Sequence, residues 1–134
     1  MVDFADNRSH RILLVDDEPF ILTATATLLR GAGHTVHTCE KWVGVAATVR
    51  DKDPDLILMD YNMPVVKGDD LCQILKRNAI NSEMKIVIFS SEPEMDLVRI
   101  VDGCGADGYI PKNVAGHVLL KNIEDILECP AAQA

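Results

Sequence analysis

The amino-acid sequence predicts an α/β domain in which helices cover both faces of a five-stranded, doubly wound parallel sheet. Short apolar runs without polar interruption alternate along the chain with longer segments whose apolar residues recur at helical spacing. Continuous apolar runs of this length are typical of strands that are buried on both faces of a parallel sheet. Their regular alternation with helices predicts a layered α/β architecture.

Three of the expected strands are wholly apolar and two are weaker. The runs ILLV, LILM and IVIF are bounded by polar residues, whereas TVHTC alternates along its length and therefore suits an edge of the sheet. The fifth run, GYI, is short. In chain order, the expected strands cover residues 12–15, 35–39, 56–59, 86–89 and 108–110.

Proline and glycine residues mark the limits of the expected helices. Pro19 fits the first turn of the first helix, and Gly31 ends it. The second helix ends before Pro54, the third begins after Gly68, and the fourth stops at Gly103. Five strand–helix units favour the flavodoxin-like strand order 2-1-3-4-5, because crossovers between parallel strands are short and right-handed. The expected helices cover residues 19–30, 42–51, a segment after 68, 94–102 and 114–127.

Length and composition indicate a single domain that binds neither nucleic acid nor membrane. The chain has 134 residues, and we expect a flexible segment at 1–10, one domain at 11–128 and a tail at 129–134. The net charge of -8 disfavours direct binding to nucleic-acid phosphates. No apolar run approaches the roughly 20 residues that cross a bilayer, and the first residues do not resemble a secretory signal. We therefore expect a cytoplasmic protein.

Polar residues follow four of the five expected strands at the point where each strand ends. Asp16 and Asp17 follow the first strand, and Asp60 follows the third. Ser90 ends or follows the fourth strand, and Lys112 lies just beyond the fifth. Because ligands of such sheets bind beyond the carboxyl ends of the strands, at the point where the strand order reverses, we expect these side chains to share one crevice.

The chemistry of this crevice favours a divalent cation and a phosphoryl group. Three neighbouring carboxylates repel one another, and a cation relieves that repulsion. Oxygen ligands without His or Cys select a hard ion, here Mg²⁺ or Mn²⁺. A carboxylate can attack phosphorus to form an aspartyl phosphate, while Lys112 holds the charge on the phosphoryl oxygens.

Each of these residues also has a purely structural explanation. Asp16 and Asp17 could cap the helix that follows them, and Ser90 could cap the next. Asp60 could be a turn residue, and Lys112 an ordinary surface lysine. Their joint placement at adjacent strand ends argues against coincidence.

Four motifs of the sequence resemble the receiver domains of two-component response regulators. In chain order they are ILLVDDEP, LILMDYNMP, IVIFSSE and GYIPK, with Gly68 between the second and the third. The resemblance covers roughly residues 11–127. It implies that Asp60 is the phosphoacceptor and that a histidine kinase or a histidine phosphotransfer protein is the donor. It implies a signalling domain that catalyses its own phosphorylation and dephosphorylation rather than a conventional enzyme.

The resemblance also implies a metal site. Asp17, Asp60 and the backbone carbonyl of Asn62 would ligate Mg²⁺ directly, and Asp16 would do so through water. Lys112 would contact the phosphoryl group.

A conformational switch is implied as well. Ser90 would move toward the phosphoryl group, Tyr109 would fill the vacated space, and the face of the fourth helix, fifth strand and fifth helix would be remodelled. That face would bind an unknown protein partner or a second copy of the chain. We further hypothesise that Asn62 and Glu92 set the lifetime of the phosphoryl group. Ser91 stands where the family more usually has Ala or Gly, and it would narrow access to the site or supply a further donor.

One departure from the family pattern concerns Lys112. The family usually has Pro after this lysine, with a cis bond between them, whereas here Asn113 follows and Pro111 precedes. A cis bond without Pro costs about 3–4 kcal/mol. We therefore expect either a trans bond with a rearranged loop or a strained cis bond, and the reach of Lys112 depends on which is present.

Three other functions compete with the phosphoacceptor. A phosphorylation-independent interaction module of the same fold is compatible with Asn113 and Ser91. A phosphatase of the haloacid-dehalogenase type would also use an aspartyl phosphate, but it usually has Asp where this chain has Asn62. A flavin-binding carrier should offer hydroxyl groups after the first strand, where DDEP offers negative charge.

Overall fold

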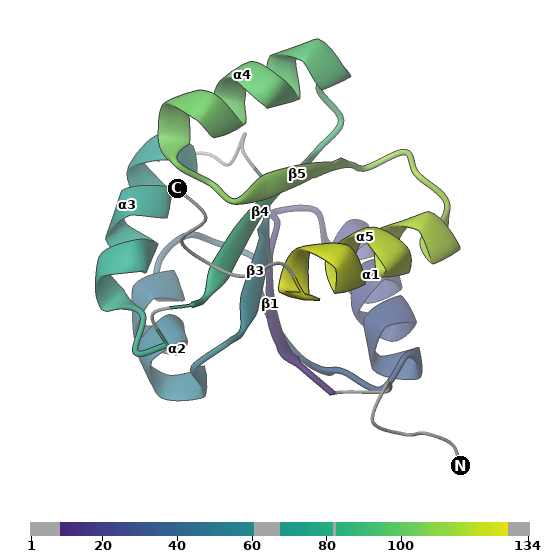
Figure 1. Ribbon diagram of the computed structural model, residues 1–134. Coiled ribbons are helices and arrows are strands. Elements are labelled where there is room, and N and C mark those ends of the chain that lie inside the picture. The colour runs from purple at the N-terminus through teal and green to yellow at the C-terminus, as the bar shows by residue number, and fades with distance from the viewer. Residues whose placement is uncertain (1–8, 61–67, 82, 129–134) are drawn as a thin grey trace.

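The computed structural model describes residues 9–60, 68–81 and 83–128, and it confirms the predicted fold (Figure 1). The five strands form one parallel sheet in the order β2-β1-β3-β4-β5. In chain order the elements are β1 (Arg11–Val15), α1 (Pro19–Gly31), β2 (Thr35–Cys39), α2 (Val45–Lys52), β3 (Leu56–Met59), α3 (Gly68–Asn78), β4 (Lys85–Ser90), α4 (Glu94–Cys104), β5 (Gly108–Pro111) and α5 (Gly116–Glu128). The predicted flanking segments lie largely outside the described residues.

Two helices begin later than the apolar pattern predicts. α2 was expected from residue 42 but begins at Val45, because Gly44 adopts a left-handed conformation with φ 88° just before it. α5 was expected from 114 but begins at Gly116. The N–H of Val114 instead donates to Pro111 O, which closes a turn after β5.

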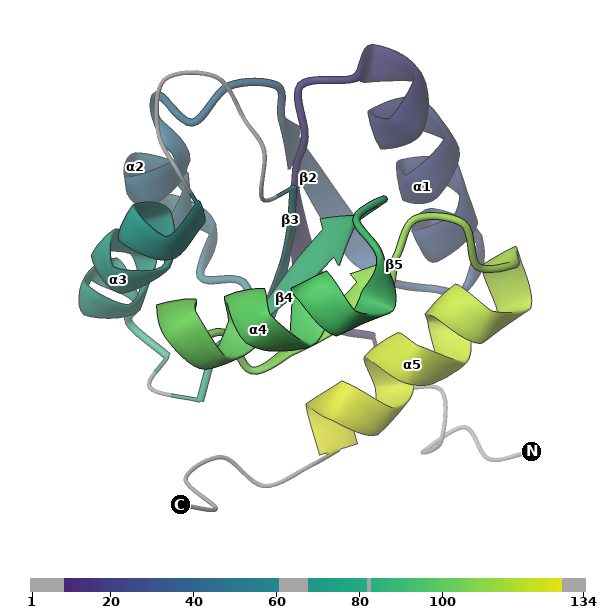
Figure 2. The same ribbon diagram turned by 90° about the horizontal axis from the view of Figure 1, so that it is seen from above.

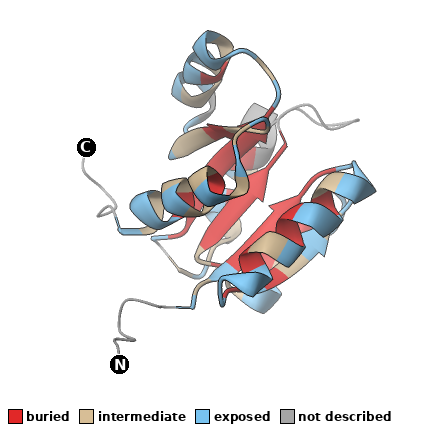
Figure 3. Cartoon of the chain, turned by 90° about the vertical axis from the view of Figure 1, so that its right-hand side faces the viewer, coloured by how far each residue is buried: buried red, intermediate tan, exposed pale blue. Residues whose placement is uncertain are grey.

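The core has two layers, one on each face of the sheet. Along β1, Leu13 and Val15 pack toward α2, α3 and α4, while Ile12 and Leu14 pack toward α1 and α5. Figure 2 shows the two groups of helices on opposite sides of the sheet. Figure 3 shows the strands largely buried and the outer faces of the helices exposed. Burial on both faces is the physical reason for the uninterrupted apolar runs.

The hydrogen-bond ladder of the sheet continues one residue past the strand ends. The N–H of Asp16 donates to Cys39 O at 3.1 Å, and the N–H of Asp60 donates to Val15 O at 2.9 Å. The N–H of Lys112 donates to Ser90 O at 2.9 Å. The backbones of these residues are therefore fixed by the neighbouring strands.

Candidate functional site

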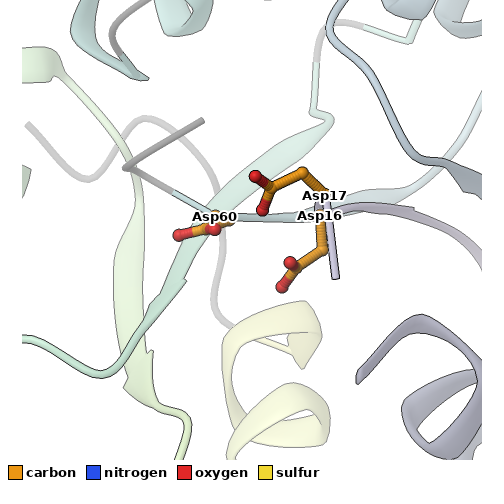
Figure 4. A group of neighbouring side chains, drawn as sticks. All are labelled: Asp16, Asp17 and Asp60. Atoms are coloured by element: carbon orange, nitrogen blue, oxygen red, sulfur yellow. The ribbon is translucent and has the colours of Figure 1, made fainter. Parts of the chain in front are cut away.

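Three carboxylates converge at the carboxyl ends of β1 and β3. Asp16, Asp17 and Asp60 each offer an oxygen, and these oxygens all lie within 4.8 Å of one another. Figure 4 shows the side chains of Asp16 and Asp17 leaving the end of β1 beside that of Asp60. Asp16 and Asp60 are buried, with exposures of 3% and 8%, whereas Asp17 is exposed. The predicted acid cluster is thus present as a geometric group.

Asp16 has a structural role in addition to its place in this cluster. Its Oδ1 accepts a hydrogen bond from the N–H of Glu18 at 3.0 Å, in the turn that leads into α1. Its Oδ2 faces the site, 2.7 Å from Lys112 Nζ. Asp16 does not cap α1, because Glu18 is the N-cap residue and no side chain among the described residues caps this helix, so the turn occupies one oxygen of Asp16 and leaves the other to the crevice.

The ammonium group of Lys112 lies among the carboxylates. Beyond Asp16, its Nζ is 3.1 Å from Glu18 Oε1 and 3.6 Å from Asp60 Oδ2. The side chain is 11% exposed, and Nζ lies 5.9 Å from the centre of the Phe89 ring. Burial alone lowers the pKa of Lys112, but the hydrogen bonds that it donates to Asp16 and Glu18, together with the charges of Asp60 and Asp16, outweigh burial and raise this pKa above its ordinary value. Lys112 is therefore positively charged at neutral pH.

The bond between Lys112 and Asn113 is trans, since the described residues contain no cis peptide. Of the two expected alternatives, the structure has the trans bond. The reach of the lysine is preserved all the same, because the backbone of Lys112 is held by Ser90 O and its side chain extends to Asp16.

The donor set fits a hard divalent cation. Within the part of the chain that is described, one ammonium faces the carboxylates of Asp16, Asp17, Asp60 and Glu18, so negative charge is in excess. All the candidate ligand atoms are carboxylate oxygens, which suit Mg²⁺. Asn62, the fourth predicted ligand, lies outside the described residues.

One predicted switch residue lies at the start of the β4–α4 connection, and the other lies on the neighbouring strand β5. Ser90 is buried at the end of β4, and its Oγ accepts a hydrogen bond from the N–H of Glu92 at 3.2 Å. Ser91 is exposed and Glu92 is half-buried. Tyr109 on β5 packs partly against the core beneath α4.

The hydroxyl of Tyr109 donates to Glu94 Oε2 at 2.8 Å. This hydrogen bond, a small burial effect and the charge of Glu94 together raise the pKa of Tyr109 above its ordinary value. Both residues line a cavity of about 510 Å³ between α4, β5 and α5. The cavity lies on the face that the sequence predicts to be remodelled.

The sequence prediction missed two acidic residues at these sites. Glu18 stands directly after the paired acids, and that position was the available signal. Glu94 begins α4. Nothing in the sequence indicates its contact with Tyr109, because that contact depends on how α4 packs against β5.

Comparison with known proteins identifies the family. Residues 12–124 match the family model of the response regulator receiver domain. The chain belongs to this family. It is therefore a receiver domain of the response-regulator family. No helix in the described residues is both long and apolar enough to span a bilayer.

Curated relatives and a solved structure agree with this assignment. The chain is 32% identical over 118 residues to the phosphate regulon transcriptional regulatory protein PhoB of Pseudomonas aeruginosa, an alignment covering 87% of this chain and 51% of PhoB. It is 31% identical over 117 residues to protein PilH of the same organism, covering 87% of this chain and 97% of PilH. A CheY-like receiver domain structure from Methanospirillum hungatei superposes with a TM-score of 0.79 at 26% identity, covering 90% of this chain and 95% of that one. The chain spans about half the length of PhoB and of several other curated relatives.

Proposed function

We propose that this receiver domain accepts a phosphoryl group on Asp60 in a reaction that depends on Mg²⁺ or Mn²⁺, and that it signals through the face formed by α4, β5 and α5. The observation that carries the proposal is the convergence of Asp60 with two further carboxylates and the ammonium of Lys112. In Asp16, one oxygen accepts the Glu18 N–H and the other faces Lys112. Asp60, which directly follows the central strand β3, is the phosphoacceptor in this proposal.

Asp16, Asp17 and Asp60 would hold the metal, with Asp16 acting through water and the backbone carbonyl of Asn62 completing the set. When bound there, the ion would offset the charge that spreads over the phosphoryl oxygens during transfer. Lys112 would hold one of those oxygens, since its Nζ already lies 3.6 Å from Asp60 Oδ2.

The donor in this proposal is the phosphohistidine of a histidine kinase or histidine phosphotransfer protein. An oxygen of Asp60 forms a bond to phosphorus while the P–N bond of the donor breaks. The electron pair of that bond goes to the imidazole nitrogen, which takes up a proton. In the separate dephosphorylation step, water attacks phosphorus and the bond to Asp60 breaks, which releases inorganic phosphate and restores the carboxylate.

The output would follow from a shift in conformational population. Ser90 would turn toward the phosphoryl group, Tyr109 would move inward, and the remodelled face would bind a partner protein or a second copy of the chain. The state that binds the phosphoryl group better gains population in proportion to that preference. In this scheme Asn62 and Glu92 influence the lifetime of the phosphoryl group, and Ser91 influences access to it.

A phosphorylation assay tests the proposal directly. The chain is incubated with acetyl phosphate, with Mg²⁺ or with EDTA, and the phosphorylated species is separated on a phosphate-affinity gel. We expect Mg²⁺-dependent phosphorylation that Asp60→Asn abolishes. The matched control is Asp125→Asn, an exposed acid on α5 that pairs with Lys121.

Four outcomes would count against the proposal. Phosphorylation that survives Asp60→Asn, or that proceeds equally in EDTA, would place the chemistry elsewhere. No phosphorylation at all would favour the phosphorylation-independent module, and steady turnover of small phosphate esters would favour the phosphatase.

A further inference from the structure

Both proposed switch residues are tied to the same short connection. β4 ends at Ser90 and α4 begins at Glu94. At one end of this stretch, Ser90 Oγ accepts the N–H of Glu92. At its other end, Glu94 accepts the hydroxyl of Tyr109. The connection of residues 90–94 therefore holds both side chains in the conformation seen here.

The contact between Tyr109 and Glu94 bridges two elements that would separate or slide during a switch. Tyr109 belongs to β5, and Glu94 is the first residue of α4. A carboxylate in the first turn of a helix is favoured by the partial positive charge of the helix N-terminus. Glu94 is therefore well placed as an acceptor beside the cavity that it lines together with Tyr109.

We propose that Glu94 is a positioning residue that holds Tyr109 at the first turn of α4 in the unphosphorylated protein, and thereby sets how readily the receiver switches. The inference rests on the proposed function, because it assigns a regulator to that switch. It adds a residue that belongs to neither the acid cluster nor the phosphoryl site.

Two hydrogen bonds must break during the proposed switch. Tyr109 cannot move inward without withdrawing its hydroxyl from Glu94. Ser90 cannot turn toward Asp60 without releasing the N–H of Glu92. Both bonds involve residues 90–94, so a rearrangement of this connection affects both side chains. A contact that is made in only one of two states favours that state by its own net strength.

The test follows Tyr109 by NMR in the full chain, with ¹³Cζ-labelled tyrosine. The chain has two tyrosines, so Tyr109→Phe assigns the resonances. Mg²⁺ with beryllofluoride, which mimics a bound phosphoryl group, is titrated into each variant. Glu94→Ala removes the acceptor, and Glu94→Gln keeps an uncharged one.

We expect Glu94→Ala to reach half-maximal change at a beryllofluoride concentration about three- to tenfold below that of the wild type, the range expected for loss of one hydrogen bond. Glu94→Gln should lie between the two. The matched control is Asp96→Ala, which removes a carboxylate from the same helical turn, where Asp96 pairs with Arg99 instead. Its midpoint should equal that of the wild type.

An independent measurement reports the contact without any phosphoryl mimic. In a pH titration, Glu94→Ala should lower the pKa of Tyr109, because the hydrogen bond that raises it is gone. Urea unfolding of each variant verifies that the fold is retained.

The failures of the two proposals are distinguishable. If beryllofluoride shifts Tyr109 in the wild type but not in Asp60→Asn, and Glu94→Ala has an unchanged midpoint or an unchanged Tyr109 pKa, the role of Glu94 is refuted while the phosphoacceptor stands. If beryllofluoride leaves the Tyr109 resonance of the wild type unmoved, the proposed switch fails, and the role of Glu94 fails with it.

Discussion

Asp17→Asn should stabilise the protein in the absence of metal and weaken its response to Mg²⁺. Asp17 is exposed and makes no hydrogen bond or ion pair among the described residues, so the substitution removes charge without breaking a contact. Its carboxylate nevertheless lies close to those of Asp16 and Asp60, which are buried. The mutation therefore isolates the repulsion within the acid cluster.

The size of the effect follows from the spacing of the charges. At the outer separation of 4.8 Å, two unit charges repel by about 3.5 kcal/mol at an effective dielectric constant of about 20, and by about 0.9 kcal/mol at about 80. Because Asp17 is exposed, the lower value is the better guide for each of its two pairs, and lost attraction to Lys112 offsets part of the gain. We expect a net stabilisation of about 1 kcal/mol at low salt, which shrinks as added salt screens the charges.

Urea unfolding provides the assay, followed by fluorescence of the single tryptophan, Trp42, which packs against the core. In EDTA the variant should unfold at a higher urea concentration than the wild type. At Mg²⁺ about 100 times its dissociation constant, the wild type should gain about 2.7 kcal/mol, and the variant should gain less.

The control for this prediction is Asp125→Asn, which removes an equal charge from an exposed helical pair and should change stability by no more than about 0.5 kcal/mol. A variant that is less stable than the wild type in EDTA would refute the reasoning, since the carboxylates would then be fully compensated. An equal gain from Mg²⁺ in both proteins would show that Asp17 does not ligate the ion.

Three further predictions concern stability. Lys112→Met removes the ammonium partner of the buried carboxylates and should lower the free energy of unfolding in EDTA by about 3 kcal/mol. Lys112→Arg keeps a positive charge and should retain most of the wild-type stability. Equal urea midpoints for the two variants would contradict this prediction. Burial, reinforced by the neighbouring His10, lowers the pKa of His34 below its ordinary value of 6.5. The free energy of unfolding should therefore fall as pH drops through 6.5, by at most about 1.4 kcal/mol per pH unit. His34→Asn should flatten that dependence in urea midpoints measured from pH 7.5 to 5.5. Ile57→Ala, at a fully buried position of β3, should lower the free energy of unfolding by about 2–5 kcal/mol, as measured by thermal unfolding. Phe20→Ala, at a position that is 81% exposed, should lower it by less than about 0.5 kcal/mol. Similar losses in both variants would contradict the assigned core.

The sheet was predictable because its central strands are uninterrupted apolar runs, which can be located in the sequence without other information. Residues 56–59 form β3 as expected, β1 begins one residue earlier than predicted, and β4 extends one residue further at each end. A strand that is buried on both faces must be apolar throughout, so its limits coincide with the first polar residues. The start of α2 was less predictable, since it depends on the backbone conformation of Gly44, which hydropathy does not reveal.

The acid cluster and the approach of Lys112 were predictable from topology, but the contact of Lys112 with Glu18 was not. Once the strand order is known, residues that follow β1 and β3 must be neighbours. The contact of Lys112 with Glu18 joins residues 94 positions apart and depends on where a long side chain settles. The choice between a trans and a cis bond at Asn113 likewise needed the structure, because both were compatible with the sequence.

Backbone hydrogen bonds at the strand ends hold the acidic residues near one another, and this affects both the stability of the protein and its affinity for metal. The backbones of Asp16 and Asp60 are held in place, because their N–H groups are bonded to Cys39 O and Val15 O. A positive charge that enters the crevice relieves the repulsion between their carboxylates. Lys112 supplies one such charge, but it faces several carboxylates and also reaches Glu18 outside the acid cluster. Repulsion among the carboxylates lowers the stability of the metal-free protein, and the same negative charge favours binding of a divalent ion, which is why Asp17→Asn should change both quantities in opposite directions.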